Sequence, residues 1–251
     1  MIRERGSMEW YPAPSYLVKR KVILDFLKTL KGKDFLEVGS GAGDLLYSLE
    51  KRGYAGLGID LSCEAVELAR NRLTRGAVNT ENKGLDEVSG EYSIVIASEV
   101  LEHHEDDIGF LKKLRDRLKD GGYLLITVPA RMDKWGTNDD FCGHVRRYER
   151  DELREKIRES GLDPLFIYSY GVPVYNIMKP FYDRAIKKGV QKEEASEART
   201  EKSGGMWLFT GMKALFNILF NDVTMFPFYL LQKLFFKIDL GNGYFAVAIK
   251  H

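Results

Sequence analysis

The chain has 251 residues, and its 38 lysines and arginines nearly balance its 37 aspartates and glutamates. That length is enough for one full α/β core and exceeds a minimal domain, so we expect an insertion or an extra lobe. Without a block rich in lysine or arginine, and with only Cys63 and Cys142, the composition supports no nucleic-acid partner, disulfide framework or metal-ligand cluster, and it favours a reducing cytoplasm.

Residues 1–30 predict an aromatic lead-in followed by a helix. The lead-in has charged residues near its start and no apolar h-region, so we do not expect a signal peptide. Two of its tyrosines, Tyr11 and Tyr16, are candidate substrate contacts. Apolar residues then recur at helical spacing from Leu17 to Leu30, and the pattern stops at Gly32.

The segment 35–44, FLEVGSGAGD, carries the strongest signal in the chain. A short apolar run contains Glu37, glycines follow at alternate positions, and a helical pattern begins after Asp44. This order predicts a buried strand, a tight turn whose backbone can approach a ligand, and a helix N-terminus. Asp60 then ends a second strand-like run, at about the separation expected of an acid that binds a ribose.

The residues around this turn distinguish between two classes of ligand. A dinucleotide-binding turn has the pattern G-x-G-x-x-G/A, and the pyrophosphate lies on the helix N-terminus. Here Asp44 occupies the position that requires Gly or Ala, and Glu37 precedes the turn. Two carboxylates would repel a phosphate dianion in a partly dehydrated site. They suit a ligand with a ribose, no phosphate and a positive charge, and S-adenosylmethionine (SAM) has all three.

Strand and helix patterns continue to alternate as far as Gly171, which predicts a doubly wound parallel sheet. The predicted elements are strands at 76–80, 92–98, 123–129 and 165–170, helices from 99 to about 118 and over 151–161, and a last strand at 244–249. The third strand is the least distinct, because Ala77-Val78 is its only apolar pair.

The motifs EVGSGAG, GID, YSIVIASEVLEH and LKDGGYLLITVP, in this order, resemble the class I SAM-dependent methyltransferases. The likeness is greatest to the subgroup that methylates small molecules, quinones, sugars and lipids. The resemblance implies an α/β fold: a doubly wound, Rossmann-like, mostly parallel sheet of seven strands. It covers the core at 31–171 and a final antiparallel strand within 241–251, so residues 172–240 become a helical insertion before that strand.

The resemblance and the topology together predict the cofactor site, because ligands of open α/β sheets bind at the carboxyl ends of the strands. The predicted SAM contacts are Glu37, Gly39, Ser40, Gly41, Gly43, Asp60, Leu61, Asn82, Ser98 and Glu99. The turn would line methionine and ribose, Asp60 would hold the ribose, and Leu61 would pack on the adenine. Glu81 is the alternative to Asn82, at a place where the family often has Asp. The product would be S-adenosylhomocysteine.

His103 and His144 are the candidate catalytic groups. His103 matches the E-H motif of the family, and an imidazole there would take a proton from an acceptor hydroxyl. The alternative is that it only orders the start of the helix. His144 lies in the loop GHVRRY at 143–148, which is similar to a string in methyltransferases of sugar- or lipid-linked substrates. No metal ligands are predicted.

The same loop supplies three candidate substrate contacts, Arg146, Arg147 and Tyr148. Guanidinium groups bind carboxylate or phosphate in a bidentate way, so the two arginines would hold an anionic part of the acceptor. The alternative is that one arginine pairs with a nearby acid, such as Asp139, and that the tyrosine packs in the core.

Within the insertion, residues 187–205 predict a charged linker and residues 206–240 an apolar block. The block has three interpretations. It forms a buried cap over the active site, it docks on a membrane surface with its lysines near the head groups, or it spans the membrane. Charged and polar residues interrupt it, which makes a spanning helix the least favoured. The first two interpretations both predict a hydrophobic acceptor.

The leading hypothesis is a SAM-dependent methyltransferase, cytoplasmic or peripheral to a membrane, that acts on a small hydrophobic or lipid- or sugar-linked acceptor. Oxygen is favoured over nitrogen or carbon as the methylated atom. One alternative is a SAM-binding protein without turnover, a regulator or assembly partner that uses the apolar block as its interface. A further alternative is an NAD-dependent oxidoreductase, which Asp44 disfavours.

Overall fold

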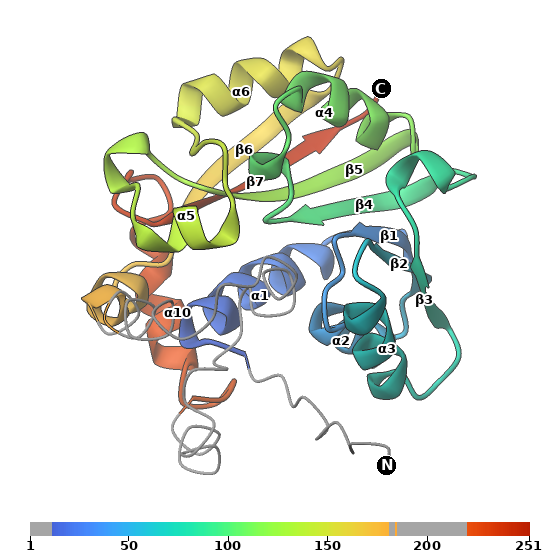
Figure 1. Ribbon diagram of the computed structural model, residues 1–251, viewed down its shortest axis with the longest axis horizontal. Coiled ribbons are helices and arrows are strands. Elements are labelled where there is room, and N and C mark those ends of the chain that lie inside the picture. The colour runs from blue at the N-terminus through green and yellow to red at the C-terminus, as the bar shows by residue number, and fades with distance from the viewer. Residues whose placement is uncertain (1–11, 181–183, 185–219) are drawn as a thin grey trace, which may run out of the picture.

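A seven-stranded sheet forms the centre of the protein in a computed structural model that describes residues 12–180, 184 and 220–251 (Figure 1). The strands are β1 (Asp34–Val38), β2 (Ala55–Asp60), β3 (Val78–Asn82), β4 (Tyr92–Ser98), β5 (Leu118–Pro129), β6 (Asp163–Tyr170) and β7 (Gly243–Ile249). Their order across the sheet is β3-β2-β1-β4-β5-β7-β6, and β7 runs antiparallel to both of its neighbours while the other pairs are parallel. The predicted fold class is confirmed.

Helices cover both faces of the sheet. The α-helices are α1 (Pro14–Leu27), α2 (Asp44–Glu50), α3 (Cys63–Arg72), α4 (Asp107–Arg115), α5 (Thr137–Cys142), α6 (Arg150–Glu159) and α10 (Phe226–Lys233). In Figure 1, α4 and α6 lie above the sheet, whereas α1, α2, α3 and α10 lie below it. Short 3-10 helices span Leu85–Glu87, Leu101–His103 and Met132–Lys134.

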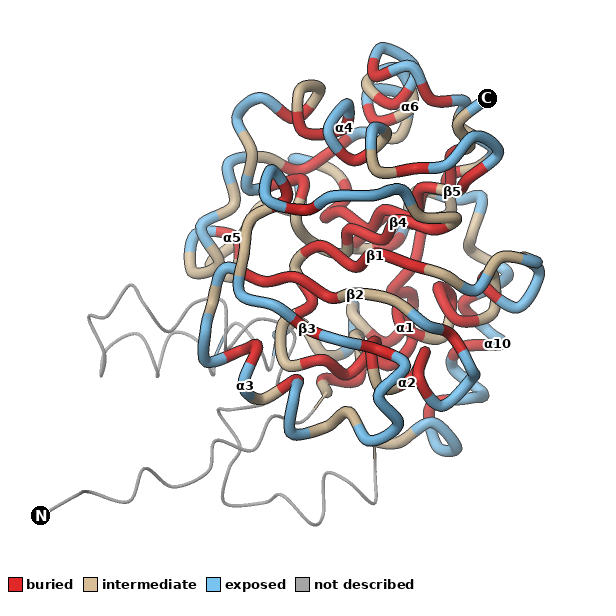
Figure 2. The backbone as a smooth tube through the Cα atoms, turned by 90° about the vertical axis from the view of Figure 1, so that its right-hand side faces the viewer, coloured by how far each residue is buried: buried red, intermediate tan, exposed pale blue. Residues whose placement is uncertain are grey.

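The two helical layers bury separate apolar clusters against the strands. One cluster joins α4 and α6 to the sheet through side chains such as Leu111 and Ile157. The other joins α1, α2 and α10, and there Phe26 makes edge contacts with the rings of Phe166 and Phe245. Figure 2 shows the strands as mostly buried between these layers. Because both faces are covered, ligand access is restricted to the ends of the strands.

Three element boundaries differ from the sequence prediction. The third strand begins later than predicted, and its register pairs Asn82 with Asp60. The helix after β4 does not begin at Glu99, because Asp106 caps α4 by accepting a hydrogen bond from the Gly109 N–H at 2.9 Å. β5 begins at Leu118, before the strand predicted at 123–129, and it contains Gly121, which has a φ of 73° where the β4–β5 pairing shifts register.

The insertion predicted before the last strand is present, since α10 lies between β6 and β7 in the chain. The charged linker predicted at 187–205 and the predicted substrate contact Tyr11 lie outside the described residues. Among the helices in the described parts of the chain, none combines the length and the apolar character that crossing a membrane requires.

Candidate functional site

The glycine turn connects β1 to α2 at the point where the strand order reverses. Gly41 has a φ of 52°, and a Cβ added to it would meet nothing within 4 Å, so its backbone faces open space. Gly43 has a different role: its φ is 74°, and a Cβ there would lie 2.6 Å from the Cβ of Ala69, so this glycine permits α2 and α3 to pack closely. Open backbone beside Gly41 is what the approach of a ligand requires.

Asp60 ties the end of β2 to this turn. Its Oδ2 accepts a hydrogen bond from the Gly41 N–H at 2.8 Å, and its Oδ1 accepts one from the Ser62 N–H at 2.9 Å. Each carboxylate oxygen can accept a second hydrogen bond, so the ribose contact predicted for Asp60 remains chemically available. Asn82 donates to the Asp60 carbonyl at 3.0 Å, and Leu61 is 82% exposed beside it. The predicted ribose and adenine contacts therefore lie together.

Two polar atoms next to the turn are buried without a hydrogen-bond partner. They are Oε2 of Glu37 and Oγ of Ser40. Burial, followed by the nearby charges of Asp44 and Asp60, raises the pKa of Glu37 well above its ordinary value. Buried polar atoms are normally paired, so this pair of atoms fits a site that is completed by a ligand. A cationic group beside Glu37 would supply the missing partner.

The electrostatic role that the sequence predicts for Asp44 needs correction. The Arg20 guanidinium forms a buried ion pair with the Asp44 carboxylate, and a second nitrogen of Arg20 reaches Asp222. Asp44 is therefore neutralised by α1 and does not repel a phosphate by itself. The Tyr16 hydroxyl hydrogen bonds to Asp44, which, after burial, helps to raise the pKa of Tyr16. This places Tyr16, a predicted substrate contact, beside the cofactor turn.

The end of β4 brings Glu99 into the same region. Glu99 has a φ of 58°, which is strained for a residue with a side chain, and such strain is concentrated at functional sites. The Tyr170 hydroxyl, from the end of β6, donates to Glu99 at 2.7 Å, and the Lys19 ammonium lies 3.7 Å from the same oxygen. Burial opposes ionisation, but Lys19 and Tyr170 outweigh it and lower the pKa of Glu99. Ser98 is held by Thr127, with their hydroxyl oxygens 2.9 Å apart.

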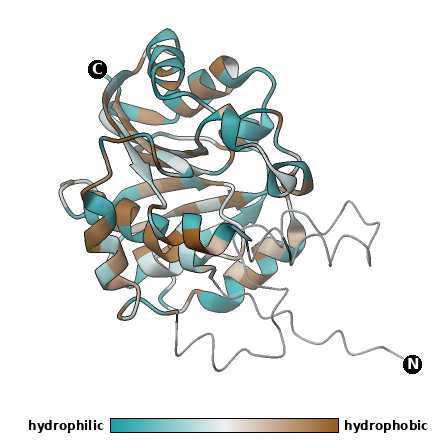
Figure 3. Ribbon diagram, turned by 90° about the vertical axis from the view of Figure 1, so that its left-hand side faces the viewer, coloured by the Kyte–Doolittle hydropathy of each residue, from teal (hydrophilic) through white to brown (hydrophobic). Residues whose placement is uncertain are grey.

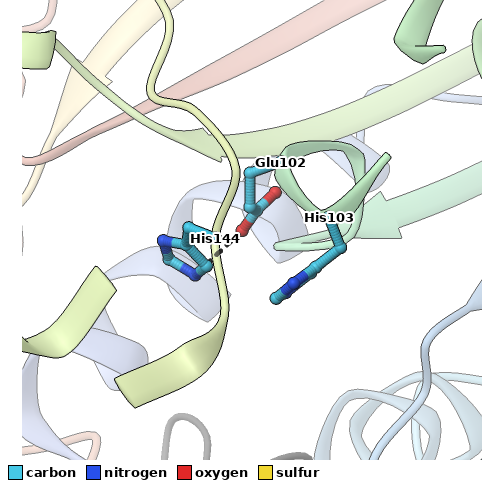
Figure 4. A group of neighbouring side chains, drawn as sticks. All are labelled: Glu102, His103 and His144. Carbon is cyan, nitrogen blue, oxygen red and sulfur yellow. Dashed lines mark ion pairs between the residues drawn. The ribbon is translucent and has the colours of Figure 1, made fainter. Parts of the chain in front are cut away.

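A second group of titratable side chains lies next to Glu99 and consists of Glu102, His103 and His144 (Figure 4). Figure 4 shows Glu102 and His103 projecting from one turn, with Glu102 directed toward His144 on another loop. Glu102 is fully buried, and neither of its carboxylate oxygens has a hydrogen-bond partner. Its Oε1 lies 3.8 Å from Nε2 of His144. Burial, and then the charge of Glu99, raises the pKa of Glu102 well above its ordinary value.

Hydrogen bonds fix the tautomers of both histidines. Nδ1 of His144 lies 2.8 Å from Asp139, and Nδ1 of His103 lies 3.3 Å from the Gly143 carbonyl. A carboxylate and a carbonyl only accept hydrogen bonds, so each Nδ1 is a donor, and in the neutral imidazole Nε2 then carries the lone pair. Desolvation, and then His144, lowers the pKa of His103. Both imidazoles are thus arranged to accept a proton at Nε2.

The same group has the donor set of a divalent-cation site. One carboxylate and two imidazoles offer ligand atoms that all lie within 4.8 Å of one another. Nδ1–H of each imidazole is bound to an oxygen acceptor, the arrangement that usually orients metal-ligating histidines. The composition alone predicted no metal ligands, because His144 joins the adjacent Glu102 and His103 only in the fold.

Two of the substrate contacts predicted in the loop 143–148 are wrong. Arg147 is 3% exposed, and its guanidinium binds both oxygens of Asp139, at 2.8 and 2.9 Å. Tyr148 is fully buried, and its hydroxyl donates to Asp107 at 3.0 Å. Their functional groups have no exposed surface for an acceptor. The alternative interpretation, an arginine paired with Asp139 and a tyrosine in the core, is confirmed.

Arg146 is also bound within the protein. Its guanidinium donates to the Asp107 carboxylate and to the Glu105 carbonyl, both at 2.8 Å. The substrate contact for Arg146 remains a prediction, and it would require the side chain to share its donors. The three neighbouring side chains 146–148 therefore hold the loop that presents His144.

Sequence reasoning missed four residues of this region: Lys19, Glu102, Asp139 as the partner of His144, and Tyr170. None of them belongs to a local motif that names its role. A weak signal was available for Glu102, since it directly precedes His103 in the E-H motif. The other three reach the region from α1, α5 and β6, and only the fold brings them together.

Comparisons with known proteins identify the family of the chain. The family model described as "Methyltransferase domain" matches residues 14–165. The chain belongs to this family. A ubiquinone biosynthesis O-methyltransferase of Nitrosospira multiformis is 28% identical over 157 residues, which cover 53% of this chain and 64% of the relative. The chain spans about half to two thirds of the length of the curated relatives it matches.

Solved structures share the fold. The magnesium protoporphyrin IX methyltransferase of Synechocystis, crystallised with SAH, is 18% identical, with a TM-score of 0.53 over 61% of this chain and 75% of that one. The cyclase SpnF is 16% identical, with a TM-score of 0.62 over 96% of this chain and 86% of that one. A methyltransferase and a cyclase thus share this fold, so the reaction has to be argued from the site.

Proposed function

We propose that this protein is a SAM-dependent methyltransferase that methylates an oxygen of a small hydrophobic or lipid- or sugar-linked acceptor. The observation that carries the proposal is the pair of unpartnered buried atoms, Glu37 Oε2 and Ser40 Oγ, next to the open backbone of Gly41. The nearest cations are already paired, Arg20 with Asp44 and Lys19 with Glu99, so the unpartnered oxygen of Glu37 suits a cationic nucleoside better than a phosphate. The family membership and the relatives named as O-methyltransferases support the same class of reaction.

Different residues of the site would bind different parts of the cofactor. When bound, SAM supplies a methyl group already activated by its sulfonium. Asp60 would accept the ribose hydroxyls while it also holds the Gly41 N–H. Leu61 and Asn82 would border the adenine, and Ser98 and Glu99 would approach the methionine part. With the leaving group already activated, the protein's main contribution is to align an acceptor and exclude water.

We assign removal of the acceptor proton to Nε2 of His144. Asp139 orients this imidazole through Nδ1, and Arg147 holds Asp139 in turn. The Asp139 carboxylate would also stabilise the imidazolium that forms, as in other histidine–carboxylate pairs. His103, whose lowered pKa keeps it neutral at pH 7, would accept a hydrogen bond at the same place. A base at this position typically accelerates a reaction by about 10²- to 10⁴-fold.

A second route to the same ionisation is favoured by the two unpartnered oxygens of Glu102. A divalent cation held by Glu102, His103 and His144 would polarise the acceptor hydroxyl and lower its pKa, so that its proton could leave to water and no protein base would be needed. Chelation distinguishes the routes. Activity that survives dialysis against EDTA assigns the proton to His144. Activity that is lost and then restored by added Zn²⁺ or Fe²⁺, ions that imidazole ligands suit, assigns it to a bound cation.

The proposed function is tested with methyl-labelled SAM. The protein is incubated with the labelled cofactor and a lipid extract, and mass spectrometry identifies the molecule that gains the label. Isothermal titration calorimetry with SAM and with NADH is run in parallel. Binding of SAM without NADH, together with transfer of the label, is the expected result. Heat on titration with NADH alone would defeat the proposal, and SAM binding with no labelled product would favour the non-catalytic alternative.

A further inference from the structure

α10 turns polar side chains toward the protein and leucines toward solvent, the opposite of an ordinary surface helix. Its buried residues include Tyr229 and Gln232, whereas Leu230, Leu231 and the adjoining Leu234 are 48%, 42% and 72% exposed. A helix on the surface of a globular protein normally turns its apolar stripe toward the core. Figure 3 views the protein from the side on which α10 lies in Figure 1, and hydrophobic stretches are visible on the helices there.

Specific hydrogen bonds hold α10 in this orientation. The Tyr229 hydroxyl donates to Asp25 of α1 at 2.5 Å, and the Gln232 amide oxygen accepts from the Gly171 N–H at 2.7 Å. The Phe236 carbonyl, after the helix, accepts from the Ser169 N–H at 2.8 Å. Rotating the helix to bury its leucines would break the first two bonds and leave buried polar groups unpaired. The outward apolar face is therefore fixed by the fold.

The exposed side chains form one surface. We call it the α10 surface and define it as Phe226, Phe228, Leu230, Leu231, Lys233, Leu234, Lys237 and Ile238, all of which are exposed. The segment from Val223 to Ile238 contains two lysines and no aspartate or glutamate. Large exposed apolar patches mark interaction sites, and the charge of this one is entirely positive.

We propose that the α10 surface docks on an anionic lipid bilayer. Leucine and phenylalanine side chains would enter the boundary between head groups and acyl chains, and Lys233 and Lys237 would contact the anionic head groups. A second copy of the chain fits less well. A symmetric contact through this surface would bring four lysines together, and the acids that flank the segment, Asp222 and Asp239, already pair with Arg20 and Arg150 of their own chain.

Docking there would also bring the bilayer to the functional edge of the sheet. Gln232 binds the backbone immediately after Tyr170, and the Tyr170 hydroxyl binds Glu99. β6 and β5 run in the same direction, because both are antiparallel to β7, so Tyr170 and Thr127 lie toward the same edge. An acceptor with a lipid tail would reach the site without leaving the membrane. This membrane contact rests on the proposed function, and it can be tested without any acceptor.

The test is sedimentation of the full chain with phosphatidylcholine vesicles, with and without phosphatidylglycerol. The wild type is expected to pellet with the anionic vesicles. The double change Leu231→Asn and Leu234→Asn removes two apolar contacts and should weaken binding at least about tenfold. The double change Lys233→Glu and Lys237→Glu should weaken binding to anionic vesicles by about tenfold or more and leave the weaker binding to neutral vesicles unchanged.

Matched controls change the same residue types elsewhere. Leu165, at the other end of β6, is 48% exposed, and Lys112 on α4 is also exposed. Leu165→Asn and Lys112→Glu should pellet like the wild type. SAM affinity by calorimetry, measured on every variant, reports folding independently of the membrane. If the wild type stays in the supernatant with both vesicles, or the leucine variant pellets like the wild type, the proposal is wrong. If the wild type is a dimer in solution and the leucine variant is a monomer, the α10 surface binds a second copy of the chain. That result would also overturn the proposal.

Discussion

The cofactor turn and the histidine group differ in how the chain builds them. The turn is local: one strand, three glycines and one helix follow one another within residues 34–50. The histidine group is assembled from the turn after β4, the loop after α5 and, through Glu99, the end of β6. The local part is specified by backbone conformation, and the assembled part by buried ion pairs. Changes in the first should therefore act on cofactor binding and changes in the second on turnover.

The largest expected effect tests the assignment of turnover to His144. The change His144→Gln keeps a polar side chain but removes the base, and label transfer from SAM should fall by about 10³-fold. SAM affinity should stay within twofold of the wild type, because no cofactor contact is removed. The change His103→Asn is the control and should cost much less. A variant at position 144 with near-normal turnover would remove this residue from the mechanism.

Breaking the support of His144 should act on stability as well as on turnover. The change Asp139→Asn leaves Arg147 buried without its counter-charge, which should lower the free energy of unfolding by about 3 kcal/mol at pH 7. Burial opposes ionisation of Asp139, but the hydrogen bonds from His144 and Arg147 prevail and lower its pKa.

The pH dependence of the difference in unfolding free energy between the wild type and Asp139→Asn tests whether the lost charge causes it. Because the pKa of Asp139 is lower in the folded protein, the pair stabilises the fold at pH values above about 4, and this contribution is lost as the pH falls further. Denaturant unfolding of the wild type and the Asp139→Asn variant should therefore converge in acid. Curves that stay parallel down to pH 3 would show that the substitution acts through packing instead.

On the cofactor side, Asp60→Ala should weaken SAM binding by about 100-fold. The substitution removes the carboxylate that we propose accepts the two ribose hydroxyls, and two hydrogen bonds to a charged group, at about 1.5 kcal/mol each, correspond to roughly that factor. It also removes the acceptor of the Gly41 and Ser62 N–H groups. Calorimetry measures the affinity, and circular dichroism verifies the fold. The SAM affinity of Asp60→Asn, which keeps one acceptor oxygen, should lie between those of the wild type and the alanine variant. Unchanged affinity in the alanine variant would disprove the cofactor assignment.

The smallest effect concerns the contact that joins the two regions. The change Tyr170→Phe removes the hydrogen bond to Glu99 and should weaken SAM binding by roughly fivefold, the equivalent of about 1 kcal/mol. Since Tyr170 contacts neither histidine, the pH profile of turnover should keep its shape. A shift of that profile would show that the charge of Glu99, which helps to raise the pKa of Glu102, also changes the ionisation that controls turnover.

Much of the fold could be predicted from local sequence. β4 occupies the predicted residues 92–98, and β1, β6 and β7 overlap their predicted ranges, since their apolar runs have no competing interpretation. The boundaries that moved depend on longer-range effects. The residues of β3 are mostly polar, and its pairing with β2 places Asn82 beside Asp60. The start of α4 is set by its N-cap, Asp106. An edge strand takes its register from its neighbour.

The candidate site was predicted less evenly. The residues of the cofactor turn lie where the motif places them, because the turn has positive φ at Gly39, Gly41 and Gly43, a conformation that glycine adopts without strain. Arg147 and Tyr148 were assigned to substrate, although they are buried against Asp139 and Asp107. The string GHVRRY does not show which of its side chains face inward. That depends on acids contributed by two other elements.

The amino-acid sequence alone determined the sheet, the position of the ligand turn and the insertion before the last strand. These follow from hydrophobic periodicity and from backbone conformations that only certain residues adopt. Tertiary structure alone decided which charges are neutralised, which buried acids lack a partner and which side of α10 faces outward. Those properties depend on residues far apart in the chain, since the protonation and pairing of a charge are set by what packs around it.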